Sequence, residues 1–414
     1  MAQVPVKVEV VAGDSGYLLL RGGQPYIVRG AGMEIDDVAR FAANGGSSIR
    51  TWTTDSRVQD LGELLDRAHA HGVTVAVGLP MKAERHGFDY DDPVAVAAQR
   101  ESLRDDVLRY RNHPALLAWI VGNELNHSYT NPRVFDAVED VARMIKSLDP
   151  NHPVTTALAG YYPRVVAEAL ERAPSLDFLS LQLYGSLFSL PERIRASGFT
   201  RPFMVTEWGT IGYWEMENTS WGVPVELTSS EKADVIERAW REVLIAFPGQ
   251  LIGSYVFFWG QKQERTPTWF GLLLESGEQT EAADVMHRAW TGAQPANRTP
   301  RVHAMQLDGK GSRDSVTLIA GRTYEVAFDV VDPDGDPLRY RWEVKPESDA
   351  TQAGGDFEAR IGNIDGLLGD AAAPSTTLTV AGPGRYRLFA YAFDDHGHAA
   401  HANIPFLVGP GDVP

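Results

Sequence analysis

The chain has 414 residues, of which 43% are hydrophobic and 22% are charged. This balance is typical of a folded globular protein and excludes a largely disordered one. The net charge of −17 disfavours binding to nucleic acid phosphates. No apolar run is long enough to cross a bilayer. The absence of cysteine excludes disulfides and thiol catalysis. We therefore expect no nucleic acid partner and no membrane span.

The chain opens with a predicted β-hairpin. Two short β-like runs, Lys7–Val11 and Tyr26–Arg29, flank a turn at Gly22 and Gly23. The first five residues lack the charged and then apolar pattern of a signal peptide, so we expect none in this sequence.

Strand and helix patterns then alternate over about 265 residues. Eight runs predict strands: Tyr26–Gly30, Ser47–Trp52, Val73–Leu79, Leu116–Gly122, Val154–Leu158, Leu176–Tyr184, Phe203–Thr206 and Leu251–Trp259. Seven amphipathic segments predict helices: Val58–Ala70, Val94–Tyr110, Arg133–Leu148, Arg164–Arg172, Pro191–Ser197, Ser230–Phe247 and Glu281–Trp290.

This count and size predict an α/β fold, a (β/α)8 TIM barrel over residues 1–292. A doubly wound open sheet is the alternative fold, but no glycine-rich phosphate loop follows the first predicted strand. Residues 293–300 have the composition of a linker.

The C-terminal part has a different pattern. Beyond the linker, helical periodicity is absent, and short β runs with turns between them predict a small all-β sandwich over residues 301–414. The runs are Ser315–Ile319, Thr323–Val331, Leu338–Val344, Ser375–Val380, Tyr386–Phe393 and Asn403–Val408.

Two predicted strands end in a carboxylate. The apolar run from Leu116 leads to Gly122-Asn123-Glu124, and the run from Phe203 leads to Glu207. Catalytic residues of parallel barrels lie at the C-terminal ends of the strands. Two carboxylates presented there suit retaining glycoside hydrolysis, which needs an acid/base and a nucleophile about 5–5.5 Å apart.

These residues carry a resemblance to a known group. Asn123-Glu124 on the fourth strand and Glu207-Trp208-Gly209 on the seventh occur with Arg50 and Trp52 on the second, Tyr184 on the sixth and Trp259 on the eighth. Together they resemble clan A of the glycoside hydrolases, over roughly residues 15–292. The chain is similar both to the family-two barrel, without that family's N-terminal β domains, and to the fungal β-1,3-glucanosyltransferases.

The resemblance implies a role for each residue. Glu124 would be the acid/base and Glu207 the nucleophile that forms a glycosyl-enzyme. Arg50 and Tyr184 would hold Glu207, Asn123 would bind the sugar 2-OH, and Trp259 would lie under the sugar in the −1 subsite. The alternatives are structural: Glu124 as a helix cap, Glu207 and Arg50 as an ion pair, and the aromatic residues as core.

Further residues are candidates for substrate binding. They are the cleft residue Gln182, the strand-end residue Trp208 and two tryptophans of the following long loops, Trp214 and Trp269. Long rim loops commonly carry specificity, and aromatic rings suit the apolar faces of pyranoses. Packing within the loops is the alternative for each.

We expect no cofactor and no metal site. His69 and His71 do not share a helix face, and His396 and His398 lack ligand partners at suitable spacing. The turn 332–336 has the carboxylates for Ca²⁺, but we favour a structural Asp-Gly turn between strands. The segment from Val331 resembles Ig-like or polycystic-kidney-disease-type modules, which accompany secreted carbohydrate enzymes, so we expect a periplasmic or secreted protein.

The sequence thus predicts a retaining β-glycosidase or transglycosylase whose partner is an oligosaccharide or polysaccharide, with a β-glucan as the expected substrate. The competing hypothesis is a non-catalytic carbohydrate-binding protein with a degenerate barrel. Retention of Glu124, Glu207, Asn123 and Arg50 favours the enzyme, because a pure binding protein does not require them.

Overall fold

The computed structural model describes residues 4–56, 59–352 and 354–410. The chain forms two compact units. The barrel unit comprises Met1–Gly209 and Ala239–Trp259, and the β unit comprises Thr210–Arg238 and Gly260–Pro414. Two segments that the sequence analysis assigned to the barrel, 210–238 and 260–292, therefore belong to the β unit.

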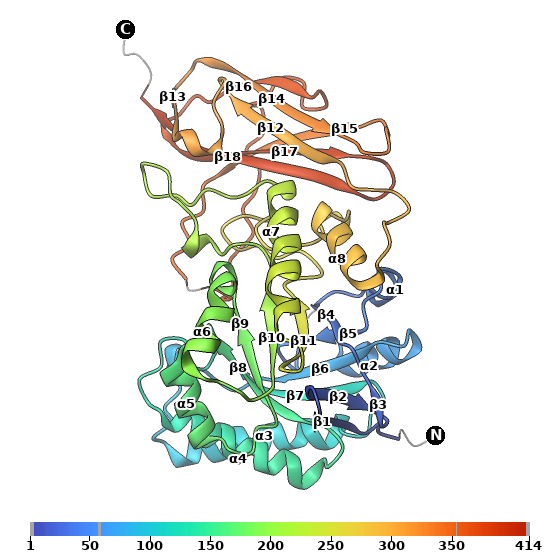
Figure 1. The fold of residues 1–414 in the computed structure, drawn as a ribbon. Helices are drawn as coiled ribbons and strands as arrows, with labels where there is room; N and C mark the ends of the chain where they lie inside the picture. The colour runs from blue at the N-terminus through green and yellow to red at the C-terminus, as the bar shows by residue number, and fades with distance from the viewer. Residues whose placement is uncertain (1–3, 57–58, 353, 411–414) are drawn as a thin grey trace. The chain divides into compact units, whose positions relative to one another are not determined.

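Eight parallel strands close into the barrel in the order β10-β11-β4-β5-β6-β7-β8-β9 (Figure 1). The predicted TIM barrel is confirmed. Its strands lie at or near the predicted runs, because uninterrupted apolar sequence marks strands that are buried on both faces. The strands are β4 (Arg29–Gly32), β5 (Ser48–Arg50), β6 (Thr74–Leu79), β7 (Leu116–Asn123), β8 (Val154–Ala159), β9 (Leu179–Gln182), β10 (Phe203–Trp208) and β11 (Leu251–Val256).

Helices follow most of these strands. They are α1 (Val38–Ala43), α2 (Leu61–Ala70), α3 (Pro93–Tyr110), α4 (Arg133–Leu148), α5 (Pro163–Arg172), α6 (Leu190–Ser197), α7 (Ser229–Glu242) and α8 (Glu281–Thr291). The sequence did not predict α1, which spans six residues and buries only Val38 and Phe41. Val58, the predicted start of α2, lies outside the described residues. No described helix is long and apolar enough to span a membrane.

Short 3-10 turns occur at Glu84–His86, Gly185–Ser189, Tyr213–Glu215, Leu244–Ala246 and Ser312–Asp314. A small sheet of β1 (Val8–Gly13), β2 (Gly16–Arg21) and β3 (Gln24–Pro25) precedes the barrel. Val8 and Leu19 of this sheet share a buried cluster with Ala118, Met204 and Tyr255 of barrel strands. The N-terminal hairpin is therefore part of the barrel's hydrophobic core.

The C-terminal strands of the β unit form two sheets, ordered β12-β14-β16 and β13-β18-β17-β15. A common core contains Phe328, Trp342, Leu378, Leu388 and Phe406, which agrees with the predicted all-β domain. The strands are β12 (Arg301–Leu307), β13 (Val316–Ile319), β14 (Thr323–Val331), β15 (Arg339–Pro346), β16 (Ser375–Thr379), β17 (Gly384–Phe393) and β18 (Ala399–Gly409). The sequence did not predict β12. The resemblance to Ig-like modules stays a prediction.

A buried carboxylate links the long segment 210–238 to these sheets. Glu226 is 2% exposed, and its Oε1 accepts from Lys232 Nζ at 2.5 Å and from Thr268 Oγ1 at 2.8 Å. Its Oε2 accepts from Thr266 Oγ1 at 2.6 Å and from Asn403 Nδ2 at 2.7 Å. A buried charge is stable only when it is paired and hydrogen-bonded in this way.

A second buried ion pair lies beside the first. Arg387 of β17 donates to both carboxylate oxygens of Glu347 at 3.0 Å, to Asn403 Oδ1 at 2.8 Å and to the carbonyl of Pro224 at 2.9 Å. Asn403 therefore contacts both pairs. These contacts explain why segment 210–238 belongs to the β unit.

We expect Glu226→Gln to lower the free energy of unfolding by about 3–5 kcal/mol at neutral pH, because Lys232 would stay buried without its counter-ion. Urea unfolding measures the change. Glu237→Gln, on the exposed side of the same helix α7, is the matched control and should have little effect. Equal stability of the Glu226 and Glu237 variants would contradict the role given to the pair.

The β unit should also lose stability on acidification. Burial raises the pKa of Glu226. The Lys232 charge and its hydrogen bond lower the pKa by more than burial raises it, so the net result is a pKa of about 2, compared with 4.5 in the unfolded chain. Burial and the nearby Lys232 lower the pKa of His401 from 6.5 to about 3. In both cases the unfolded chain binds the proton more readily, so protonation favours unfolding.

Stability should therefore fall as the pH drops below about 6.5 through His401, and more steeply below about 4.5 through Glu226. Unfolding temperatures measured between neutral and acidic pH test this expectation. His401→Gln should weaken the dependence between these two values, and an unchanged profile would argue against a neutral, buried His401.

Candidate active site

The end of strand β7 turns sharply and presents Glu124. Gly122 has a φ of 73°, and a Cβ at this position would lie 2.4 Å from Leu125 Cδ1, so only glycine fits here. Glu124 is half-buried and has a left-handed φ of 51°, which is unfavourable for a residue with a side chain. Its backbone N–H donates to the carbonyl of Ala157 on β8 at 2.9 Å, which fixes the turn.

Glu207 lies within a set of converging donors. It is 6% exposed, and its Oε1 accepts from Arg50 Nη1 at 2.5 Å, Trp52 Nε1 at 2.7 Å and Gln182 Nε2 at 3.0 Å. Its Oε2 accepts from Tyr184 OH at 3.0 Å. The donors come from the C-terminal ends of β5 and β9 or the residues just after them. The structure thus brings together five predicted residues from three separate strands.

Arg50 connects Glu207 to Asn123. Its guanidinium is 1% exposed, and Nη2 donates to Asn123 Oδ1 at 2.5 Å while Nη1 donates to Glu207. Gln182 Nε2 also donates to both Asn123 Oδ1, at 2.8 Å, and Glu207 Oε1. Because Asn123 Oδ1 accepts twice, the amide is oriented and its NH₂ group is the remaining donor. The residue before Glu124 is therefore held by the same donors as Glu207.

Aromatic rings surround this network. The Arg50 guanidinium carbon lies 4.9 Å from the Trp52 ring centroid. Phe257, directly after β11, meets Trp52 and Tyr184 edge to face at centroid distances of 5.7 and 5.8 Å. The sequence analysis selected Trp259 and missed Phe257. Phe257 and Trp259 are two residues apart, so strand alternation does not distinguish them and gave no signal that selects Phe257.

Two predicted tryptophans are fully buried and pack against other residues. Trp259 is fully buried, donates its indole N–H to Asp37 Oδ2 at 2.9 Å and packs edge to face on Phe41. Trp208 is fully buried and stacks on Trp240 of α7 at a centroid distance of 6.4 Å. Because Trp208 is adjacent to Glu207 on β10, its side chain points to the opposite face of the strand. The structure does not bring it to Glu207.

The two loop tryptophans belong to the β unit and differ in exposure. Trp269 is 1% exposed, and its indole N–H donates to the carbonyl of Ile211 at 3.0 Å. Trp214 is 51% exposed. Trp269 therefore packs within the loops, whereas Trp214 presents part of its ring to solvent.

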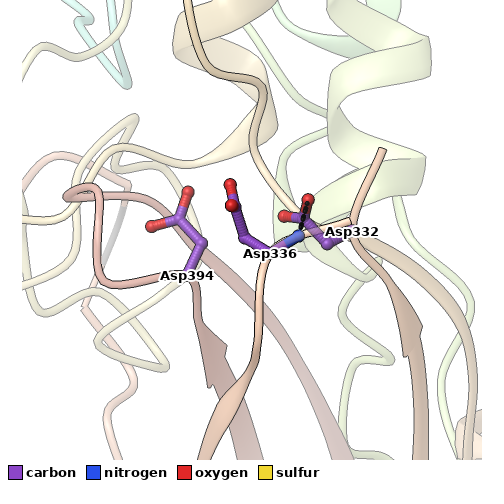
Figure 2. A group of neighbouring side chains, drawn as sticks. All are labelled: Asp332, Asp336 and Asp394. Carbon is purple, nitrogen blue, oxygen red and sulfur yellow. Dashed lines mark hydrogen bonds between the residues drawn. The ribbon is translucent and has the colours of Figure 1, made fainter. Parts of the chain in front are cut away.

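Among the described residues, one group of carboxylates has the spacing of a metal site. Asp332, Asp336 and Asp394 offer oxygens within 4.8 Å of one another, and Figure 2 shows Asp336 between the other two. Asp332 Oδ1 accepts from two backbone N–H groups, Asp336 Oδ2 accepts from Asn297, and Asp394 Oδ2 accepts from or shares a proton with His398 Nδ1. Protein groups therefore already contact these carboxylates.

The barrel is similar to glycoside hydrolase barrels. Residues 64–219 match the family model described as glycosyl hydrolases family 2, TIM barrel domain. This range contains Asn123, Glu124, Gln182, Tyr184 and Glu207. Mannan endo-1,4-β-mannosidase F of Aspergillus clavatus is 27% identical over 171 residues, which cover 34% of this chain and 39% of the relative. The chain thus spans less than half of that relative's length.

Solved structures share the fold at low sequence identity. A β-glucuronidase from Bacteroides uniformis has a TM-score of 0.54 and 15% identity, over 97% of this chain and 48% of that chain. A β-D-glucuronidase from Dictyoglomus thermophilum has a TM-score of 0.54 and 16% identity, over 69% and 54%. These similarities agree with the barrel fold.

We expect Arg50→Met to lower the free energy of unfolding by about 3–5 kcal/mol, because Glu207 would remain buried without its cation. The double variant Arg50→Met with Glu207→Gln should lose less than the single one, since no charge is then left unpaired. Denaturant unfolding of the wild type, of both variants and of Glu207→Gln gives the double-mutant cycle that measures the coupling between the two side chains. Additive losses would show that the two side chains are not coupled.

Proposed function

We propose that the protein is a retaining glycosidase in which Glu207 is the nucleophile and Glu124 the acid/base. The observation that carries the proposal is the set of donors on Glu207: a buried carboxylate held by Arg50, Trp52, Gln182 and Tyr184 at the mouth end of a barrel strand. Such a carboxylate is held in a fixed orientation, which a nucleophile at an anomeric carbon requires. The family-two match over residues 64–219 supports the same chemistry.

The two oxygens of Glu207 have different surroundings. Oε1 accepts from three donors, whereas Oε2 accepts from Tyr184. A carboxylate oxygen has two lone pairs, so Oε2 is the oxygen we assign to attack on the anomeric carbon. The Tyr184 hydroxyl would position that oxygen, and Arg50 would stabilise the charge until the glycosyl–oxygen bond forms.

Glu124 would protonate the leaving oxygen and then deprotonate the acceptor. Its left-handed backbone, held by Gly122 and by the bond to Ala157, supports this role, because strained conformations are commonly retained at functional sites. The oriented NH₂ of Asn123 would donate to the sugar 2-OH. The proposal requires the Glu124 and Glu207 carboxyl groups to come within about 5–5.5 Å of each other around the substrate.

The names of the relatives support a proposal for the class of substrate. The curated relative is named for action on β-1,4-mannan, and the structural neighbours for action on β-glucuronides. We propose a β-linked substrate and retain β-glucan from the sequence analysis beside β-mannan. Water as acceptor gives hydrolysis, and a sugar hydroxyl gives transglycosylation.

Glu207→Gln and Glu124→Gln should each lower kcat by several orders of magnitude on a β-linked substrate found in a panel of β-mannan, β-glucan and aryl β-glycosides. Either substitution removes a side chain that acts in the transition state, as the nucleophile or as the proton donor. Glu101→Gln, on the outer face of α3, is the matched control and should keep wild-type activity.

Product analysis separates the two roles. With Glu207→Gly and an aryl glycoside, azide should attack the anomeric carbon in place of the missing carboxylate and give a glycosyl azide of inverted configuration. The wild-type first product should retain the substrate's configuration. Near-wild-type activity in either glutamine variant, or an inverted first product, would overturn the assignment.

A further inference from the structure

The loop after β7, residues 124–131, carries Glu124 and has an unfavourable backbone conformation. Two of its residues that carry side chains are left-handed, Glu124 with a φ of 51° and Ser128 with a φ of 56°. Such conformations persist only where the surrounding structure holds them. The direction in which the Glu124 carboxyl points therefore depends on the contacts that fix this loop.

Asn126 fixes the first half of the loop. It is 8% exposed, its Nδ2 donates to the carbonyl of Ala159 at 2.9 Å, and its Oδ1 accepts from the backbone N–H of the same residue at 2.8 Å. An amide that donates at one end and accepts at the other fits in one orientation. Asn126 therefore binds the end of β8 in a defined way.

These two bonds continue the attachment of β7 to β8 beyond the end of β7. Asn123, the last residue of β7, lies opposite Ala157, and the backbone N–H of Glu124 bonds to the carbonyl of Ala157. The chain then turns, and the Asn126 side chain bonds to Ala159, two residues further along β8. Glu124 is thus held to β8 by its own N–H and by the side chain two positions later.

Glu84 fixes the second half of the loop. It lies in the loop after β6, in the 3-10 turn Glu84–His86. Its Oε2 accepts from the backbone N–H groups of Thr130 and Asn131 at 2.7 and 3.0 Å, and its Oε1 accepts from Thr130 Oγ1 at 2.5 Å. These hydrogen bonds, that of the Thr130 hydroxyl above all, hold the pKa of Glu84 below its usual value. One carboxylate thus holds the residues that follow the left-handed Ser128.

We propose that Asn126 and Glu84 are positioning residues for the acid/base: they hold the loop in the shape that presents the Glu124 carboxyl to the leaving oxygen. The inference deepens the proposed glycosidase function and rests on it. Both residues bind backbone or hydroxyl groups of the protein, so they act through the loop. Glu207 differs, because it lies within β10 and its own donors orient it.

A displaced acid should impair one part of the reaction. A leaving group that is a strong base must be protonated as it departs, whereas a weak base such as dinitrophenolate departs without a proton. The ratio kcat/KM reports the transition state relative to free enzyme and substrate. Loss of the loop contacts should therefore lower kcat/KM for poor leaving groups only.

The test compares two aryl β-glycosides of the sugar on which the enzyme is active. Asn126→Ala removes both bonds to Ala159 and should lower kcat/KM about 10- to 100-fold for the methoxyphenyl glycoside, but less than about three-fold for the dinitrophenyl glycoside. Glu84→Gln should show the same pattern to a smaller extent, because a glutamine offers one acceptor oxygen in place of two.

Azide provides a second measurement. The same displaced Glu124 would be a poor base for the incoming water, so hydrolysis of the glycosyl-enzyme should limit turnover of the dinitrophenyl glycoside by Asn126→Ala. Azide needs no deprotonation. It should therefore accelerate this variant, but not the wild type, and give a glycosyl azide of retained configuration.

Asn44→Ala and Asp91→Asn are the matched controls. Asn44 is another buried amide of the barrel unit, and its Nδ2 donates to the carbonyl of Arg40 at 2.9 Å. Asp91 is an exposed acid in the same loop as Glu84. A general loss of stability would affect both substrates equally, so Asn44→Ala should show no dependence on the leaving group, and Asp91→Asn should behave as wild type.

The outcomes separate this inference from the proposed function. If Glu124→Gln depends on the leaving group while Asn126→Ala and Glu84→Gln lose activity equally on both substrates, or not at all, the positioning role is overturned and the glycosidase assignment stands. Each variant decides for its own residue, and Glu84→Gln decides alone if Asn126→Ala does not fold. A Glu124→Gln variant without the dependence, or a protein inactive on every β-glycoside, would overturn both.

Discussion

The buried salt bridge between Arg50 and Glu207 is the interaction on which the candidate site depends. Neither charge would be tolerated alone at 1% and 6% exposure. The planar guanidinium reaches two acceptors at once, Glu207 and Asn123, which a lysine ammonium at the end of a flexible chain would not hold in the same way. One side chain thereby ties together the ends of strands β5, β7 and β10.

The same principle organises the β unit. Glu226 and Lys232 form a pair as buried as that of Arg50 and Glu207, and Asn403 contacts Glu226 as Asn123 contacts Arg50. In the barrel unit the polar network lies at strand ends, where a ligand can be bound. In the β unit the network holds an irregular loop against two sheets. Burial of charge thus orders the candidate active site in one unit and holds an irregular loop in the other.

The barrel and most of the Glu207 network could be predicted from the sequence because these features depend on local patterns. Buried parallel strands appear as apolar runs, and polar residues at their ends converge because the strands are parallel. The short helix α1 and the strand β12 were missed, since neither has a strong periodic pattern. Trp208 was grouped with Glu207, although adjacent strand residues face opposite sides.

The assignment of segments 210–238 and 260–292 to the β unit depends on contacts between residues far apart in sequence, such as Glu226 with Asn403 and Arg265 with Glu358. No local pattern reports such contacts. The linker-like composition of residues 293–300 marks a change of pattern, but the boundary between compact units is set by these long-range contacts.

This arrangement bears on how the chain matures during translation. A growing polypeptide folds from its N-terminus as it leaves the ribosome, but Glu226 receives its amide donor only when Asn403, 177 positions later, has been made. Closing so large a loop is entropically costly and slow. The loop after β10 therefore acquires its final shape only after β18 has been synthesised, when the barrel strands are already complete.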